Sequence, residues 1–138
     1  MWNRTLTILK PDSVRKRNAG KIISRLESEG FTILGIKRVH LTQKQAEAFY
    51  AVHRERPFFS SLVQYMMSGP VFAAALERED AVAHLRKVMG ATDPKKADKE
   101  TIRAEFGESI EQNAIHGSDS HENARLEISF FFSEADLI

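Results

Sequence analysis

The segment Asn113-Ala114-Ile115-His116-Gly117-Ser118-Asp119-Ser120 carries more information about fold and chemistry than any other part of the chain. It places a histidine in a short polar turn, beside serines and a carboxylate, a few residues before the apolar run from Leu126 to Phe132. A histidine that the backbone holds on both sides can present a neutral ring nitrogen to a substrate. Taken alone, the segment is also typical of a surface loop, so the surrounding sequence has to decide its role.

Hydrophobic periodicity on either side of this segment predicts alternating strands and helices. The expected strands are residues 4–9, 31–39, 71–76 and 128–132; the expected helices are residues 19–29, 42–55, 59–66 and 80–89, with a short one after Ser120. Residues 90–112 show little periodicity and are expected to form a long functional loop with a helical turn near 101–106. Split βαβ units in this order predict an α/β fold, an α+β sandwich of the ferredoxin-like βαββαβ type, with a four-stranded antiparallel sheet flanked by helices.

Length and composition restrict the class of protein. The 138 residues are expected to form one domain, and 42% hydrophobic with 28% charged residues is ordinary for a soluble globular chain. No apolar run is long enough to span a membrane and no secretory signal is visible. The absence of cysteine excludes disulfides and thiolate catalysis and suits a reducing cytoplasm, where we expect the protein. A net charge of +1 argues against broad nucleic-acid binding but permits a local basic pocket.

Three further segments accompany the histidine turn: Lys10-Pro11-Asp12, Arg56-Pro57-Phe58-Phe59 and Thr101-Ile102-Arg103. Together with the Asn-x-x-His-Gly-Ser-Asp pattern, they resemble the nucleoside diphosphate kinase family over nearly the whole chain. The resemblance implies the ferredoxin-like fold and a ping-pong reaction. In that reaction, the γ-phosphate of ATP or another nucleoside triphosphate passes to a nucleoside diphosphate through a phosphohistidine, with little base specificity.

The resemblance also implies roles for four residues around the reacting phosphate. His116 matches the nucleophile, and imidazole is a suitable one because histidine side chains in general have a reference pKa of about 6.5. Attack is expected from the ring nitrogen nearer the backbone, with the far nitrogen held by a partner. Ser118 and Glu127 match the residues that support the histidine. Tyr50 matches a tyrosine whose hydroxyl positions the reacting group.

Six residues match the family's substrate-binding positions. Arg86 and Arg103 would bind the transferring phosphates, since a guanidinium is always charged and forks onto phosphate oxygens. The others are the phosphate-binding Thr92, Lys10 and Asn113 beside the sugar, and Phe58 beneath the nucleobase. Without the resemblance, Arg86 would be interpreted as a solvent-exposed residue of a helix, and the Phe58-Phe59 pair as part of the hydrophobic core. No carboxylate cluster or phosphate-binding glycine loop is visible. The resemblance implies that Mg²⁺ arrives on the nucleotide phosphates, with no protein metal site, which agrees with the missing cluster.

The residues leave alternatives open. His116, Asp119 and His121 could together bind a metal, although no fourth ligand is evident. The fold could serve a nucleic-acid-binding or regulatory protein without catalysis, or a phosphohistidine relay that receives phosphate from another protein. The enzyme is favoured because the full set of matching residues is present and the net charge is near zero.

The sequence departs from the family pattern at a few positions. Lys99-Glu100 replaces a common Pro-Gly before Thr101, Phe49 stands where many members have histidine, and the chain stops at Ile138. The family forms homo-oligomers, and the altered turn and short tail weaken contacts of tail-dependent hexamers. We therefore expect a homo-oligomer, with a tetramer favoured over a hexamer.

Overall fold

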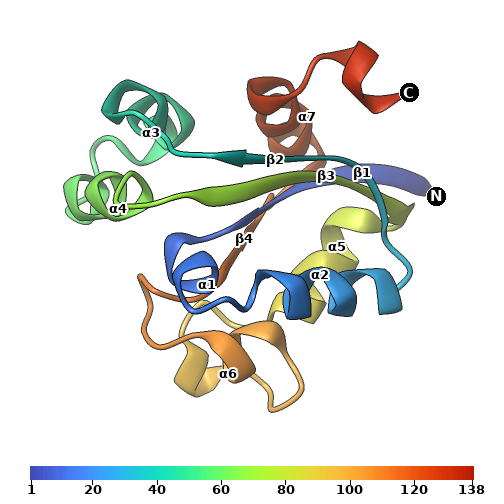
Figure 1. Cartoon of the computed structure of the whole chain (residues 1–138), viewed down its shortest axis with the longest axis horizontal. Coiled ribbons are helices and arrows are strands. Elements are labelled where there is room, and N and C mark those ends of the chain that lie inside the picture. The colour runs from blue at the N-terminus through green and yellow to red at the C-terminus, as the bar shows by residue number, and fades with distance from the viewer.

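The computed structural model describes all 138 residues, which build one antiparallel sheet with helices on both faces (Figure 1). The strands are β1 (Trp2–Leu9), β2 (Thr32–Val39), β3 (Val71–Glu79) and β4 (Ile115–Gly117), in the spatial order β2-β3-β1-β4. The helices are α1 (Pro11–Arg15), α2 (Ala19–Ser28), α3 (Gln43–Phe49), α4 (Phe59–Met66), α5 (Ala81–Met89), α6 (Ile102–Phe106) and α7 (His121–Phe131), with 3₁₀ turns η1 (Ala51–His53), η2 (Pro94–Lys96) and η3 (Glu134–Leu137). The predicted ferredoxin-like fold is confirmed.

The sheet separates two hydrophobic cores. Leu6 and Ile8 of β1 pack with Ile128 of α7 and with residues of α3 and α4 on one face. On the other face, Leu76 of β3 packs with residues of α2 and α5, including Leu85. Figure 1 shows α7 above the sheet and α2 and α5 below it. β1, the strand that pairs with β4, therefore lies in the middle of the molecule and is covered on both faces.

The predicted strand at residues 128–132 is wrong, because this segment belongs largely to α7. Ala124, Ile128 and Phe132 are all buried, and this four-residue spacing points one face of a helix at β1. Phe130 stays 39% exposed, which a strand buried on both faces would not allow. The three consecutive phenylalanines favour a strand by local propensity, but tertiary packing overrides that preference.

The fourth strand instead contains the histidine that was expected in a polar turn. His116 lies in the middle of β4, which pairs with β1 in antiparallel register over three residues. So short a strand shows no alternation that a sequence pattern could reveal. The predicted helix at 42–55 is also too long: α3 ends at Phe49 and the 3₁₀ turn η1 follows. Helix α1 was not predicted, although Pro11 occupies its first turn, where proline is favoured.

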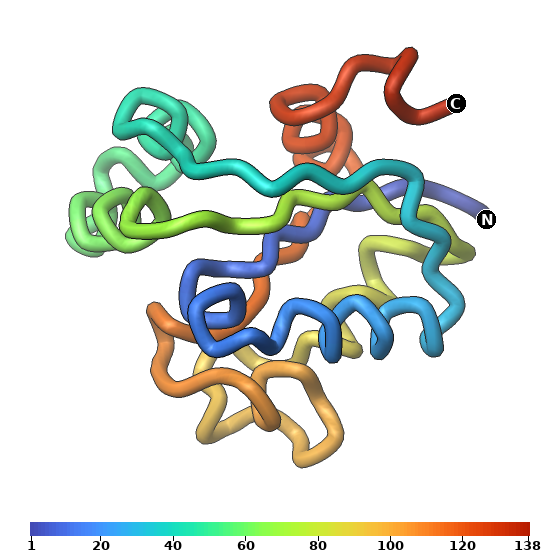
Figure 2. The backbone as a smooth tube through the Cα atoms, in the orientation of Figure 1, coloured from blue at the N-terminus to red at the C-terminus, as the bar shows by residue number.

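The remaining boundaries lie close to the predicted ones, and the segment 90–112 forms the expected long connection. It leaves α5, makes the turn η2 and the short helix α6, and returns to β4 (Figure 2). Its return brings Asn113 and Ile115 next to the carboxyl end of β1, where Lys10 follows Leu9. The long connection thus supplies one wall of a cavity whose floor is β4.

Candidate active site

A cavity of about 620 Å³ lies over β4, between the segment 48–62, helix α7 and the connection 90–112. All of the predicted site residues except Ser118 line it: Lys10, Tyr50, Phe58, Arg86, Thr92, Arg103, Asn113, His116 and Glu127. Ser118 is fully buried beneath it. Residues that are up to 117 positions apart in the chain are therefore brought to one cavity.

The backbone of His116 is fixed by the sheet. His116 lies opposite Ile8 in the β1–β4 register, and its carbonyl accepts a hydrogen bond from Thr7 Oγ1 at 2.8 Å. The following Gly117 passes close over α5: a Cβ atom here would lie 2.6 Å from Met89 Sδ and 2.9 Å from Leu85 Cδ2. Glycine is thus required for β4 to approach the helix, and the strand cannot shift without disturbing the core.

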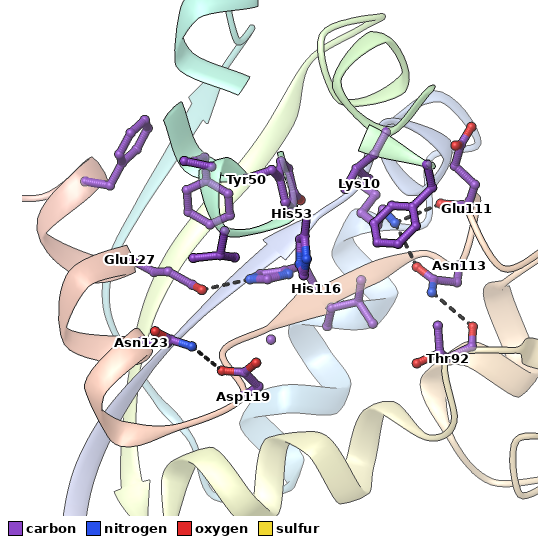
Figure 3. A pocket seen from close by; sticks show the side chains of 18 of the residues that line it. Lys10, Tyr50, His53, Thr92, Glu111, Asn113, His116, Asp119, Asn123 and Glu127 are labelled. Carbon is purple, nitrogen blue, oxygen red and sulfur yellow. Dashed lines mark hydrogen bonds and ion pairs between the residues drawn. The ribbon is translucent and has the colours of Figure 1, made fainter. Parts of the chain in front are cut away.

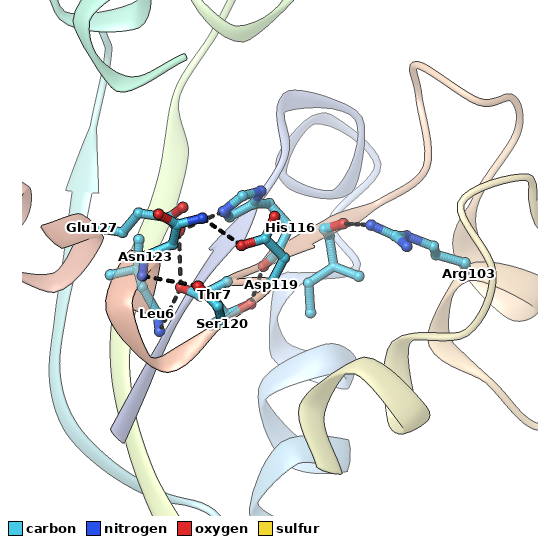
Figure 4. A network of polar contacts seen from close by, with 10 residues as sticks. Leu6, Thr7, Arg103, His116, Asp119, Ser120, Asn123 and Glu127 are labelled. Atoms are coloured by element: carbon cyan, nitrogen blue, oxygen red, sulfur yellow. Dashed lines mark hydrogen bonds and ion pairs between the residues drawn. The ribbon is translucent and has the colours of Figure 1, made fainter. Parts of the chain in front are cut away.

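The imidazole of His116 is held by one ring nitrogen. Nε2 lies 2.8 Å from Glu127 Oε1, which also accepts a 2.8 Å hydrogen bond from Ser118 Oγ (Figure 4). The Leu6 amide donates to Ser118 Oγ at 3.4 Å, which ties this group to β1. An ionised carboxylate only accepts hydrogen bonds, so the proton of a neutral imidazole lies on Nε2. Nδ1 then keeps its lone pair and makes no hydrogen bond within the chain.

Lys10 and Asn113 form a polar group on the opposite wall (Figure 3). Lys10 Nζ donates to the Glu111 carbonyl at 2.8 Å and to Asn113 Oδ1 at 2.9 Å, and Asn113 Nδ2 donates to the Thr92 carbonyl at 3.0 Å. Lys10 is only 6% exposed. Burial lowers its pKa from 10.5 to about 8, although the nearby carboxylate of Asp12 opposes the shift.

Arg103 is anchored so that its guanidinium faces the cavity. Its Nη1 donates to the Gly90 carbonyl at 3.1 Å and its Nη2 to the Ile115 carbonyl at 2.8 Å, while its buried Nε has no partner. Burial and, secondarily, the positive charge of Arg86 lower the pKa of Arg103 to about 10. The two positive charges repel each other, so an anion bound between the two guanidiniums would stabilise both.

Aromatic side chains form the remaining wall. Tyr50 is buried, and this burial, together with the Glu127 carboxylate, raises the pKa of its hydroxyl, which therefore stays protonated as a potential donor. The His53 ring stacks on Tyr50 with centroids 6.4 Å apart and lies 5.4 Å from the Phe58 ring. Phe58 is 47% exposed, so it is a surface of the cavity rather than part of a core. A flat ring at the mouth offers a face for stacking.

Asp12 is a structural site residue that the sequence reasoning did not assign. Its Oδ2 accepts from the Ala114 amide at 3.0 Å, and its Oδ1 accepts from the Tyr65 hydroxyl. Ser13 Oγ donates to the Ala114 carbonyl at 2.8 Å. These contacts hold Ala114 at φ +75°, a left-handed conformation that turns the chain into β4. The Lys10-Pro11-Asp12 motif contained the signal for this role.

Asp119 and Asn123 also line the cavity; Asn123 was not predicted as a site residue, and Asp119 was named only in the metal alternative. Asn123 Nδ2 donates to Asp119 Oδ1 at 2.6 Å, and Asn123 lies four residues before Glu127 on α7, hence on the same helix face. That spacing was the available signal. The alternative metal set of His116, Asp119 and His121 is not assembled, because His121 lines a separate cavity.

None of the helices has the length and apolar composition that a membrane-spanning helix needs.

The fold and this cavity together define a class of protein. An imidazole with a free lone pair and buried cationic side chains line one cavity that is large enough for a small ligand, an arrangement that suits transfer of a phosphoryl group. The structure therefore describes a phosphotransferase that uses a ferredoxin-like sheet to position a histidine.

Comparison with known proteins gives the family. A sequence model described as nucleoside diphosphate kinase matches residues 3–137. The nucleoside diphosphate kinase of Helicobacter pylori (strain Shi470) is 60% identical over 137 residues, which cover 99% of this chain and 100% of that protein. Its counterpart in Granulibacter bethesdensis is 57% identical over 135 residues, covering 98% and 96%. The chain belongs to the nucleoside diphosphate kinase family.

Solved structures agree with this assignment. The Aquifex aeolicus nucleoside diphosphate kinase superposes with a TM-score of 0.98 at 48% identity, covering 100% of both chains. A halophilic nucleoside diphosphate kinase from Halobacterium salinarum, solved in complex with CDP, gives a TM-score of 0.95 at 38% identity and covers 100% of this chain and 92% of that one. The activity is transfer of the γ-phosphate of a nucleoside triphosphate to a nucleoside diphosphate, which the family performs through a phosphohistidine.

Proposed function

We propose that His116 is the nucleophile of this reaction and that its Nδ1 attacks the γ-phosphorus. The observation that carries the proposal is the 2.8 Å contact of Nε2 with Glu127, which leaves Nδ1 unpaired. The Nδ1 lone pair forms the N–P bond while the bond from phosphorus to the β–γ bridging oxygen breaks, and the nucleoside diphosphate leaves with that electron pair. Glu127 stabilises the positive charge that develops on the ring, and Ser118 orients Glu127.

The cationic side chains of the cavity would act on the phosphates. Arg86 and Arg103 balance the negative charge that spreads over the phosphoryl group in transfer, and the Thr92 hydroxyl donates to a phosphate oxygen. Lys10 and Asn113, already joined by a hydrogen bond, would bind the sugar and the adjoining phosphate. The Tyr50 hydroxyl, protonated throughout the neutral range, would position the reacting group beside His116. The lowered pKa of Arg103 supports an anionic occupant.

Phe58 would stack on the nucleobase. Stacking uses the aromatic face that every base possesses, so the rates for purine and pyrimidine substrates should be similar. The exposed position of Phe58 at the cavity mouth supports this role. The CDP complex of the Halobacterium salinarum relative is an example of a nucleotide bound by this family. Phe58→Ala should weaken nucleotide binding by about 1–3 kcal/mol, measured by calorimetry with ADP and CDP.

Mg²⁺ would enter with the nucleotide. Cationic side chains surround the phosphate end of the cavity, and no three metal-ligating side chains converge there. Such a site suits Mg²⁺, because this cation retains bound water and can be held by the phosphate oxygens of the nucleotide. When bound, Mg²⁺ neutralises part of the phosphate charge. Removal of Mg²⁺ with EDTA should abolish transfer, and restored Mg²⁺ should recover it.

The quaternary state and location are also proposals. β2 is an edge strand of the sheet, and its Ile36 is 43% exposed, so a second chain could cover this edge. We propose a homo-oligomer, with a tetramer favoured over a hexamer. Light scattering that shows a monomer at micromolar concentration would exclude it. A cysteine-free chain suits a cytoplasmic location, which cell fractionation would test.

Labelling tests the assignment of His116 directly. Incubation with radiolabelled ATP and Mg²⁺ should phosphorylate the protein without an acceptor, and added nucleoside diphosphate should remove the label. The bond should be labile in acid and stable in alkali, which separates phosphohistidine from phosphoserine at Ser118 or Ser120. His116→Ala should abolish both labelling and turnover. A His116→Ala variant that still takes up label and completes turnover would assign the nucleophile elsewhere.

A further inference from the structure

Two aromatic rings contact the imidazole in addition to the Glu127 carboxylate. The Phe49 ring, at the end of α3, meets the His116 ring with centroids 5.4 Å apart and an interplanar angle of 72°. Tyr50 meets the same ring at 6.1 Å and 86°. Both contacts are edge-to-face, an arrangement that aromatic pairs prefer. The imidazole is therefore enclosed by a carboxylate and by two aromatic rings.

Phe49 is itself braced by α7. Its ring contacts Phe130 at 5.4 Å and Phe131 at 5.5 Å, and these two residues follow Glu127 by three and four positions. Residues at this spacing share one face of a helix. One face of α7 thus reaches His116 in two ways: directly through Glu127, and indirectly through the Phe49 ring.

A single hydrogen bond at Nε2 does not fix the plane of the imidazole. The ring can still rock about the Cβ–Cγ bond while Nε2 stays within hydrogen-bonding distance of Glu127. It can also flip, which would exchange the positions of the nitrogens and the carbons. Such motion would move the Nδ1 lone pair away from the line of attack, and attack depends on that alignment.

We propose that Phe49 is a positioning residue that sets the plane of the His116 imidazole and thereby keeps Nε2 on Glu127 and Nδ1 aligned for attack. The inference rests on the proposed role of His116 as nucleophile. Phe49 acts on the imidazole and not on the phosphate. It restricts the ring by occupying the space into which the imidazole would otherwise turn, and Phe130 and Phe131 keep it there.

The matched variants are Phe49→Leu, Phe49→Tyr and Phe59→Leu. Leucine keeps an apolar side chain but removes the ring, and tyrosine retains it. Phe59 is partly buried against the same core as Phe49 and makes no ring contact with His116, so it controls for a general loss of packing. Rapid-quench labelling with saturating ATP and Mg²⁺ gives the phosphorylation rate, calorimetry gives the ADP affinity, and alkaline hydrolysis with phosphorus NMR gives the ratio of the two phosphohistidine isomers.

Phe49→Leu should slow labelling by on the order of ten- to hundred-fold, leave the ADP affinity within about twofold, and produce a detectable Nε2-phosphate. Phe49→Tyr should restore the rate and the single isomer. An unchanged rate or an unchanged isomer ratio in Phe49→Leu, or the same changes in Phe59→Leu, would overturn the proposal. Label that is found on a residue other than His116 would instead refute the assignment of the nucleophile, so the two failures are distinguishable.

Discussion

Lys10 should make nucleotide capture sensitive to alkaline pH. Burial lowers its pKa from 10.5 to about 8 in the nucleotide-free protein, with Arg103 lowering it further and Asp12 and Glu111 opposing the shift. Above pH 8 the free enzyme therefore holds a neutral amine where the phosphates and sugar are expected. A bound polyanion favours the charged form again, so the effect belongs to kcat/KM, which reports the free enzyme, more than to kcat.

The size of the effect follows from the two pKa values. The difference between 10.5 and about 8 means that the empty site destabilises the charged amine, relative to water, by about 3 kcal/mol. If the nucleotide restores the ordinary value, kcat/KM falls tenfold for each pH unit above 8. The decline from pH 7 to pH 10 would then be about 100-fold. The nucleotide-free protein behaves in the opposite way. Between pH 8 and 10.5 the unfolded chain holds a proton that folded Lys10 has lost, so this residue makes stability rise with pH.

The assay is rapid-quench phosphorylation by ATP and Mg²⁺ between pH 7 and pH 10, since adenine does not ionise in this range. Lys10→Arg is the control because its guanidinium stays charged throughout, and its lower activity should show no inflection near pH 8. Urea unfolding of Lys10→Met should lack the rise in stability that Lys10 adds to the unsubstituted protein. A kcat/KM that is flat to pH 10, or the same inflection in Lys10→Arg, would refute the reasoning.

Three further changes test other parts of the structure. Glu127→Gln should slow labelling about 10- to 100-fold, the range expected for the loss of a charged hydrogen bond, with little change in ADP affinity. A changed affinity with an unchanged rate would contradict the role of Glu127. Gly117→Ala should lower the free energy of unfolding by about 1–3 kcal/mol in urea, because the new Cβ would lie 2.6 Å from Met89 Sδ; a neutral effect would show that β4 can shift. A hydrogen bond from His84 and then Arg25 lower the pKa of Glu29 below 4.5, so its contribution is present above pH 4.5 and disappears as pH falls below it. The stability difference between the unsubstituted protein and Glu29→Gln should therefore shrink on acidification, and a constant difference would refute the linkage.

The parts of the fold that could be predicted are those with strong local periodicity. β1, α2 and α5 have alternating or helical apolar patterns in the sequence, β2 and β3 are rich in apolar residues, and the boundaries of all five elements lie within a few residues of the predicted ones. The fourth strand could not be predicted in this way. Three residues of β4 are paired with β1 because Asp12 holds Ala114 in a left-handed conformation and Gly117 fits against Met89, and both contacts join distant parts of the chain.

The same limit explains what was missed in the site. Motif resemblance predicted which residues would gather, and all of them except Ser118 line one cavity, because each motif residue is placed by the fold. Resemblance said nothing about Phe49, which was noted only as a departure. Its contact with His116 depends on where α3 ends and on the face that α7 presents, and the helical character of residues 128–131 was itself mispredicted. A wrong assignment of that segment hid the packing of three aromatic rings.

The buried cationic side chains lower the stability of the empty protein but prepare its site for a nucleotide. Lys10 and Arg103 are almost completely buried and carry lowered pKa values, so each charged form is less stable in the empty cavity than in water. The chain tolerates them because carbonyl oxygens and one amide oxygen accept hydrogen bonds from Lys10 Nζ and from both terminal nitrogens of Arg103, leaving Arg103 Nε unpaired. These donors are thereby fixed in place before a nucleotide arrives, and little reorganisation is needed when phosphate charge develops. A polyanion that enters the cavity supplies the missing counter-charge, so part of the energy that burial costs the empty protein is recovered as affinity for its substrate.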